Sequence, residues 1–183
     1  MTKTGHTIEN PVTGDRVIFL ETSGGTAAEL LKVEYVITAR ETVPHLEVHI
    51  HRENHERFEV IQGNLGVLVN DEREVLNPGE VAEIPPGISH TIWNAGDGEV
   101  RILTEIRPPG EFQTFWETLF GLARDGKLNE KGVPSILQAA ILADLISTYP
   151  PGPPMFFTRS LVGILAWLGR LVGYRGRYAR YSD

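Results

Sequence analysis

Short runs of alternating apolar and polar residues fill the chain from Arg16 to Arg107. Two of these runs, residues 31–37 and 100–107, follow a period of two, which places alternate side chains on one face of a strand. Shorter apolar runs cover residues 65–70 and 75–76. Three groups of turn residues separate the runs: Asp71-Glu72-Arg73, Asn77-Pro78-Gly79 and Pro85-Pro86-Gly87. This spacing predicts a mainly β chain, an antiparallel sandwich or small barrel, rather than alternating βαβ units.

The pattern changes to helical spacing after Arg107-Pro108-Pro109-Gly110. Apolar residues from Phe112 to Ala123 predict a first helix, with Gly126 as its stop. Pro134 opens a second predicted helix, which runs to about residue 146. A stiff connector of Tyr149 and five Pro or Gly residues leads to a third apolar stretch, from Phe156 to Gly173. We therefore divide the chain into a barrel domain, residues 1–110, and a helical C-terminal extension, residues 111–183.

Charge and composition separate the same two parts. Residues 1–110 carry a net charge of −9 and residues 111–183 a net charge of +2, while 11 of the 15 aromatic residues follow residue 110. The acidic barrel part argues against nucleic acid as a partner, because phosphates need a basic face. A length of 183 residues and an apolar fraction of 41% favour one globular domain with an appendage.

Two absences bound the chemistry and the compartment. The chain has no cysteine, which excludes disulfides, thiolate metal sites and a cysteine nucleophile. The sequence MTKTGHTIENPV at the N-terminus has no apolar stretch of the kind that a secretory signal needs. We expect a cytoplasmic protein.

The third apolar stretch raises the question of a membrane. A span needs about 20 apolar residues, and Arg159 and Arg170 enclose only ten. We expect this helix to pack on the barrel or on a second copy in a homodimer. Because aromatic residues and arginines alternate towards Tyr181, the alternative is that the segment from Phe156 to Tyr181 lies on a membrane surface.

Histidines gather between His45 and His90, where five of the six in the chain are found. If His49-Ile50-His51 is a strand, its two imidazoles point to the same face, with Cβ atoms roughly 7 Å apart. Glu56 follows across a short turn, and His90 comes after the Pro85-Pro86-Gly87 turn. Imidazole and carboxylate groups in this combination are typical ligands of a transition metal ion.

The residues around these side chains match the two motifs of the cupin superfamily, H-x-H-x4-E-x6-G and G-x5-P-x-G-x2-H-x3-N. The first motif comprises His49, His51, Glu56 and Gly63, and the second comprises Gly79, Pro85, Gly87, His90 and Asn94. One departure is Val43, where the family usually has glycine. The sequence therefore resembles the cupin superfamily over about residues 30–107, and its helical tail is similar to that of a subgroup of small single-domain bacterial cupins.

The resemblance implies a double-stranded β-helix (jelly-roll) barrel with C-terminal α-helices. It also implies that His49, His51, Glu56 and His90 bind one divalent transition metal ion: Fe, Mn, Ni, Zn or Cu. We expect Gly63 and Gly79 to adopt the positive φ of hairpin corners. Pro85 and Gly87 are expected to form the turn that aims His90 inward.

The other histidines have simpler interpretations. His55 is next to Glu56 but on the opposite face of a strand, so we expect a surface histidine, with a substitute ligand as the alternative. His45 shares the parity of His49 and can line the cavity, although a position at a strand edge is the more common case. His6 is expected to be an exposed terminal residue.

Four further residues lie in or near the motif region and are candidates for a role in the chemistry. Tyr35 and Phe58 fall on inward faces, where we expect barrel packing. For Tyr35 the alternative is a proton or hydrogen-bond donor behind the metal ligands. Trp93 and Asn94 are expected to shape the end of a strand rather than to contact a substrate.

Two classes of function are compatible with this site. Three imidazoles and one carboxylate leave about two positions free on an octahedral ion, where O2, water or a chelating substrate can bind. The first class is a metal-dependent enzyme, an oxygenase or an isomerase or lyase, that acts on a small oxygen-bearing molecule with Glu56 as the catalytic base. The second class is a non-catalytic module that binds or senses a small molecule.

Overall fold

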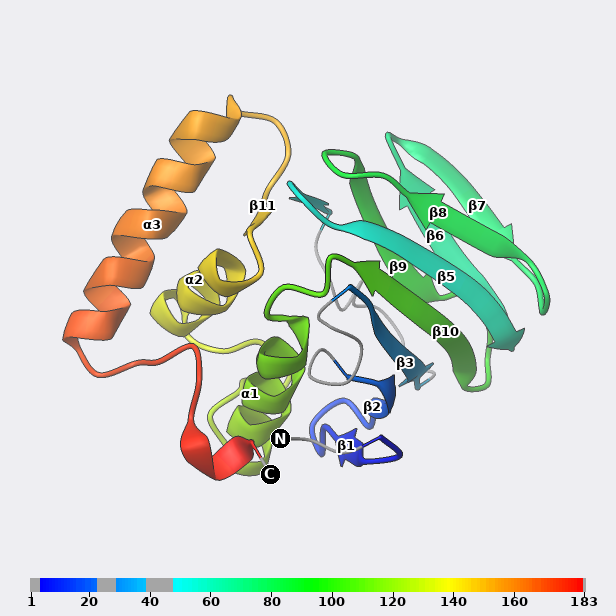
Figure 1. The fold of residues 1–183 in the computed structure, drawn as a ribbon, viewed down its shortest axis with the longest axis horizontal. Helices are drawn as coiled ribbons and strands as arrows, with labels where there is room; N and C mark the ends of the chain where they lie inside the picture. Colours follow the sequence, from blue (N-terminus) through cyan, green and yellow to red (C-terminus); the bar gives the residue numbers. More distant parts are fainter. Residues whose placement is uncertain (1–3, 23–28, 39–47, 183) are drawn as a thin grey trace.

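The computed structural model describes residues 4–22, 29–38 and 48–182. In this part of the chain two antiparallel sheets face each other, and three helices lie along one side of them (Figure 1). The first sheet has the strand order β1-β2-β3-β10-β5-β8. Its strands are Thr7–Glu9 (β1), Arg16–Glu21 (β2), Leu31–Ile37 (β3), Val100–Arg107 (β10), His55–Gln62 (β5) and Val81–Ile84 (β8).

The second sheet has the order β11-β4-β9-β6-β7. Its strands are Thr148–Tyr149 (β11), His49–His51 (β4), Ser89–Asn94 (β9), Leu65–Val69 (β6) and Glu72–Leu76 (β7). Each strand of the two sheets pairs with its neighbours in antiparallel register. This is the mainly β jelly-roll barrel that the alternating runs and the two motifs predict.

The helices follow the barrel in sequence. They are Phe112–Arg124 (α1), Ile136–Leu145 (α2) and Met155–Leu171 (α3), with a short 3-10 helix at Ala179–Tyr181. Gly126 has φ +66°, and its N–H donates to the carbonyl of Ala123 at 3.0 Å, so the predicted glycine stop of α1 is confirmed. None of the described helices is long and apolar enough to cross a membrane.

One hydrophobic cluster lies between the two sheets. Phe58, Val60 and Ile102 of the first sheet pack against Leu65 and Ile92 of the second, and each is at most 5% exposed. These residues occupy alternate positions of their strands, which is why a period of two fills the interior. Burial of this apolar surface is the main force that holds the two sheets together.

A second cluster joins the barrel to the extension. Phe112, Trp116 and Phe120 of α1 recur at helical spacing and pack against Val17 and Phe19 of β2. Helix α1 therefore shares a core with the first strands of the barrel. The division of the chain at residue 110 coincides with the start of α1, and its meaning as a boundary between folding units stays a prediction.

Three local predictions differ from the structure. The polar turn after β6 consists of Asn70 and Asp71 alone, which have φ +46° and +72° and form a tight hairpin, so Glu72 and Arg73 already belong to β7. The second helix begins at Ile136 instead of Pro134. Tyr149 belongs to β11 rather than to the connector, because this two-residue strand exists only through its pairing with β4.

Candidate metal centre

His49 and His51 project from the same face of β4, as the strand period predicts. They are 8% and 4% exposed, and their ring centroids lie 4.7 Å apart. The ring of Phe112, the first residue of α1, contacts His51 edge-on at 5.0 Å between centroids. The extension therefore covers this side of the pair with an aromatic ring.

His90 enters the same space from β9. It is the ladder partner of His49 across the β4–β9 pair, and their ring centroids are 4.5 Å apart. The turn before β9 fixes this register: Gly87 has φ +83°, and its N–H donates to the carbonyl of His51 at 2.7 Å. The predicted role of Gly87 in aiming His90 inward is therefore confirmed.

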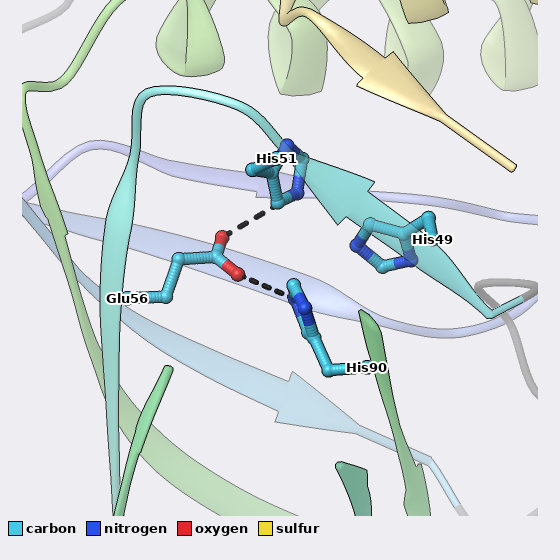
Figure 2. Close-up of side chains that lie close together, drawn as sticks. All are labelled: His49, His51, Glu56 and His90. Atoms are coloured by element: carbon cyan, nitrogen blue, oxygen red, sulfur yellow. Dashed lines mark hydrogen bonds and ion pairs between the residues drawn. The ribbon is translucent and has the colours of Figure 1, made fainter. Parts of the chain in front are cut away.

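Glu56 reaches the three histidines from the opposite sheet. It lies on β5 between Ile84 and Ile106, and its carboxylate is 2.8 Å from Nε2 of His90 and 3.7 Å from Nε2 of His51 (Figure 2). Because Glu56 and His55 are successive residues of β5, their side chains point to opposite faces. The site is thus closed by both layers of the barrel.

These four side chains form one buried group of potential ligands. Their ligand atoms all lie within 4.8 Å of one another, and each residue is at most 8% exposed. Three imidazole nitrogens and one carboxylate oxygen are a donor set that suits a divalent transition metal ion. The residues present fit such an ion, as the resemblance implied.

The electrostatics of the site reflect strong coupling inside the barrel. Burial lowers the pKa of His51, although the Glu56 charge opposes this effect. Burial also acts to lower the pKa of His90, but its hydrogen bond and charge interaction with Glu56 are stronger and raise that pKa. Burial alone would raise the pKa of Glu56, yet His90 and the other two imidazoles lower it. Glu56 is therefore held ionised, as a metal ligand must be.

The ring nitrogens that face away from Glu56 have partners of their own. Nδ1 of His90 lies 3.0 Å from the carbonyl oxygen of Ile88, within the barrel. Nδ1 of His51 lies 2.8 Å from Oγ1 of Thr148, in β11 of the extension. Because Thr148 is also the ladder partner of His51, backbone pairing holds the two side chains together. In both histidines Nε2 remains directed towards the centre of the site.

Of the remaining histidines, the two that the structure describes do not join this group. His55 is partly exposed, and its Nε2 lies 3.9 Å from the carboxylate of Glu83, which confirms the surface interpretation. His6 is half-buried rather than exposed, and its carbonyl accepts the N–H of Phe19 in β2 at 2.9 Å. His45 and the departure from the motif at Val43 lie outside the described residues.

Tyr35 and Phe58 serve the packing of the barrel. Phe58 is 5% exposed within the cluster between the sheets. Tyr35 packs against Trp116, and its hydroxyl lies 3.5 Å from a carboxylate oxygen of Asp15. Burial, with the nearby Asp15 charge, raises the pKa of Tyr35 well above its ordinary value. The tyrosine is thus a neutral hydrogen-bond donor to Asp15.

Trp93 and Asn94 shape the end of β9, as predicted. The side-chain amide of Asn94 donates to the carbonyls of Ile37 and Gly98, at 3.1 and 2.7 Å, and its oxygen accepts the N–H of Gly96 at 2.9 Å. The indole of Trp93 covers the backbone of Gly66, where a Cβ atom would lie 2.0 Å from the ring. Position 66 therefore needs glycine, because Trp93 of the paired strand β9 occupies the space that a side chain would take.

Sequence reasoning missed the contacts of Thr148 and Phe112 with His51. No motif includes either residue, and both lie more than 60 positions away in the chain. It also missed Thr104, whose buried hydroxyl has no hydrogen-bond partner within the described ranges. Thr104 follows the inward alternation of β10 two residues before Ile106, the ladder partner of Glu56. Its hydroxyl therefore faces the same interior as the metal ligands.

A comparison with protein families agrees with this fold and this site. Residues 37–105 match the model of the family described as "Cupin domain". The matched segment contains all four of the clustered side chains. This segment of the chain is a cupin domain.

Curated relatives cover the barrel and part of the extension. The chain is 29% identical over 146 residues to a probable oxidoreductase, virH, of Hypocrea virens. The aligned segment covers 73% of this chain and 66% of that protein. It is 27% identical over 148 residues to the epoxidase atD of Aspergillus terreus. That alignment covers 74% of this chain and 46% of that protein. The chain thus spans between about half and two thirds of the length of these relatives.

Solved structures with a similar fold include an RmlC-like cupin from Shewanella frigidimarina. It is 20% identical, with a TM-score of 0.48 over 58% of this chain and 86% of that chain. At this level the likeness concerns the fold alone.

Proposed function

We propose that the chain is a mononuclear metal-dependent enzyme, an oxidoreductase that acts on a small oxygen-bearing molecule inside the barrel. The observation that carries the proposal is the buried group of His49, His51, Glu56 and His90, with its ligand atoms within 4.8 Å. Two curated relatives are named as an oxidoreductase and an epoxidase, which favours redox chemistry over isomerisation or elimination. In a dioxygenase reaction both atoms of O2 enter the substrate, so no external reductant is needed.

Different side chains would have different roles in such a site. The three imidazoles and the carboxylate would hold the ion, which when bound supplies Lewis acidity and, if it is iron, manganese or copper, redox chemistry. Phe112 excludes water on the side of His51. Thr104 offers a hydroxyl within the interior, where it can hydrogen-bond an oxygen of the substrate.

Glu56 is the candidate for proton transfer as well as for metal binding. Its lowered pKa keeps the carboxylate ionised in the absence of an ion, which suits a ligand but makes a weak base. We propose that Glu56 accepts a proton from the substrate, a role that its lowered pKa limits to a substrate proton that is itself acidic. Glu56→Gln retains an oxygen donor and removes the base, so it should reduce turnover more than metal content.

Elemental analysis tests the metal site. We expect about one transition metal ion per chain in the purified protein and its loss in a variant with both His49→Ala and His90→Ala. The matched control is His55→Ala, which removes a partly exposed histidine that faces Glu83. Unchanged metal content in the double variant contradicts the site.

Oxygen consumption separates the enzyme from a binding module. Catechols, diketones and flavonols carry adjacent or conjugated oxygens that can chelate an ion and are suitable first substrates. Uptake of O2 that depends on the metal and on Glu56 supports the oxidoreductase. Tight binding of such compounds by the iron-loaded protein without uptake favours the non-catalytic alternative.

A further inference from the structure

Helix α3 has an unusual distribution of side chains. Its residues that are buried against the protein are the small Thr158, Ala166 and Gly169. Its largest apolar side chains point into solvent and are between 57% and 64% exposed: Phe156, Phe157, Leu161, Ile164, Trp167 and Leu171. The orientation of an amphipathic surface helix is the reverse, with the large apolar residues towards the core.

The exposed residues form one continuous face. At 3.6 residues per turn they fall within an arc of about 140°, roughly opposite the face that packs on α2. Gly169 allows α3 to approach α2 closely because it has no Cβ atom. A Cβ atom at this position would lie only 2.9 Å from the side chain of Ile141. The helix is thus seated on the protein by its small residues, and its large residues are left uncovered. Figure 1 shows α3 at the edge of the molecule, with α2 between it and the barrel.

The size of this face matches that of a protein interface. With about 200 Å² of surface for a large apolar side chain, six such residues at these exposures present roughly 700 Å². The largest apolar patch of a typical monomer is about 300–600 Å², and a standard interface buries about 800 Å² on each partner. Exposed Val172, directly after the helix, continues the face.

The charges around α3 favour a protein partner over a lipid surface. Helices that lie on membranes carry many Lys or Arg residues on their polar face, whereas α3 carries only Arg159 and Arg170. Arg170 is already paired with Asp144 at 2.7 Å. The extension that contains α3 has a net charge of only +2, which gives little attraction to anionic lipids.

We propose that the exposed face of α3 binds the same face of a second copy of this chain, in an antiparallel twofold dimer. A twofold contact needs one self-complementary patch, which a continuous apolar stripe provides. In the antiparallel arrangement the positive end of each helix dipole lies beside the negative end of the other, which favours this orientation over a parallel one.

Sedimentation of the full chain tests the dimer. We expect the protein at ten micromolar to sediment with twice its mass of 20.3 kDa. A variant with both Leu161→Glu and Trp167→Glu should have a dimer dissociation constant raised at least about 100-fold. Val75→Glu is the matched control, because Val75 is an apolar residue of β7 that is 51% exposed away from α3. Far-ultraviolet circular dichroism checks that each variant is folded.

A cross-link provides a second readout that does not depend on a disruptive variant. Ile164 lies near the middle of the exposed face, so the antiparallel dimer places the two copies of this residue close together. Because the chain has no cysteine, Ile164→Cys should form a single intermolecular disulfide under mild oxidation, and Val75→Cys should not. A monomeric wild-type protein at 100 micromolar, or a dimer unaffected by the two glutamates, overturns the proposal. So does flotation of the protein with phosphatidylglycerol vesicles that the same glutamates abolish, since it assigns the face to lipid.

Discussion

Oγ1 of Thr148 lies 2.8 Å from Nδ1 of His51, 97 residues away in the chain. Both residues are on adjacent strands, β11 and β4, whose backbones pair at the same position. The carbonyl of Ile146, just before β11, also forms a hydrogen bond with His51. A segment outside both cupin motifs therefore fixes the ring orientation of one candidate metal ligand.

Replacement of Thr148 by valine should weaken metal binding while it leaves the fold intact. Loss of a hydrogen bond to the far nitrogen of a metal-binding histidine typically costs about 10–100-fold in affinity. We expect a value near 10-fold, because Ile146 still contacts His51. Competition with a chromophoric chelator measures the affinity, and Thr148→Ser should restore it. Equal affinities of the wild-type protein and Thr148→Val would show that the hydroxyl does not position His51.

The wild-type measurement distinguishes two failures. If the wild-type protein binds no metal, the proposed site itself is wrong. If it binds metal and the valine variant binds equally well, only the role of Thr148 is wrong.

Removal of the metal should lower the thermal stability of the protein. An ion present at 100 times its dissociation constant stabilises the folded state by about 2.7 kcal/mol. For a chain of this length that corresponds to a fall in melting temperature of roughly 5–10 °C when a chelator is added. Differential scanning fluorimetry at neutral pH, with and without the chelator, measures this difference.

The same difference should depend on pH. The imidazoles must lose their protons before they can bind an ion, so the effect of the metal shrinks as the pH falls. The ordinary pKa of histidine is about 6.5. Because Glu56 raises the pKa of His90, the decline should begin at a pH above that value. A stabilisation that stays constant between pH 8 and pH 5 would contradict ligation by histidine.

Thr104→Val should stabilise the protein or leave its stability unchanged. The hydroxyl is buried and has no partner within the described ranges, so its removal relieves a desolvation cost of about 1–2 kcal/mol. The substitution also has nearly the same shape, which makes it the matched control for Thr148→Val. Urea unfolding of the chelated protein measures the stability. A loss greater than about 1 kcal/mol would mean that the hydroxyl has a stabilising partner.

Glu105→Gln should destabilise the protein by about 1 kcal/mol at pH 7. The carboxylate of Glu105 is 3.1 Å from Nζ of Lys32 and 2.9 Å from a guanidinium nitrogen of Arg107. Burial acts to raise the pKa of Glu105, but these two cations outweigh it and lower the pKa. A lowered pKa contributes stability above the unfolded value of about 4.3, and this contribution is lost as the pH falls through the folded value.

Unfolding of the chelated protein at several pH values tests that sign. The difference between the wild-type protein and Glu105→Gln should be constant from pH 7 to pH 5 and then decrease as the pH falls below the unfolded value of about 4.3. Glu99→Gln is the control, because that carboxylate pairs with Arg16 at 42% exposure and should contribute only a few tenths of a kcal/mol. A difference that grows as the pH falls would exclude the ion pairs as its cause.

Local pattern was sufficient to predict most of the strands and helices. The period of two in residues 31–37 and 100–107 agrees with β3 and β10 to the residue. Helix α1 begins at Phe112, where the spacing changes. Element boundaries were less accurate where tertiary pairing decides them, as at β11, whose two residues show no period at all.

The candidate site was likewise predictable only in the features that local pattern decides. The spacing of the two motifs was enough to name His49, His51, Glu56 and His90, because strand parity and the Pro85–Gly87 turn set the direction of each side chain. That these side chains converge within 4.8 Å depends on the packing of one sheet on the other.

The sequence by itself therefore determined the barrel, its four candidate ligands and the absence of any thiolate ligand. Only the tertiary structure decided that Thr148 and Phe112 adjoin His51, and that α3 turns its large apolar residues outward. The physical reason is the range of the interactions. Periodicity and turn chemistry act over a few residues, whereas these contacts join segments whose separation in the chain carries no local signal. A helical stripe likewise shows which residues share a face, but not which of two apolar faces the protein covers.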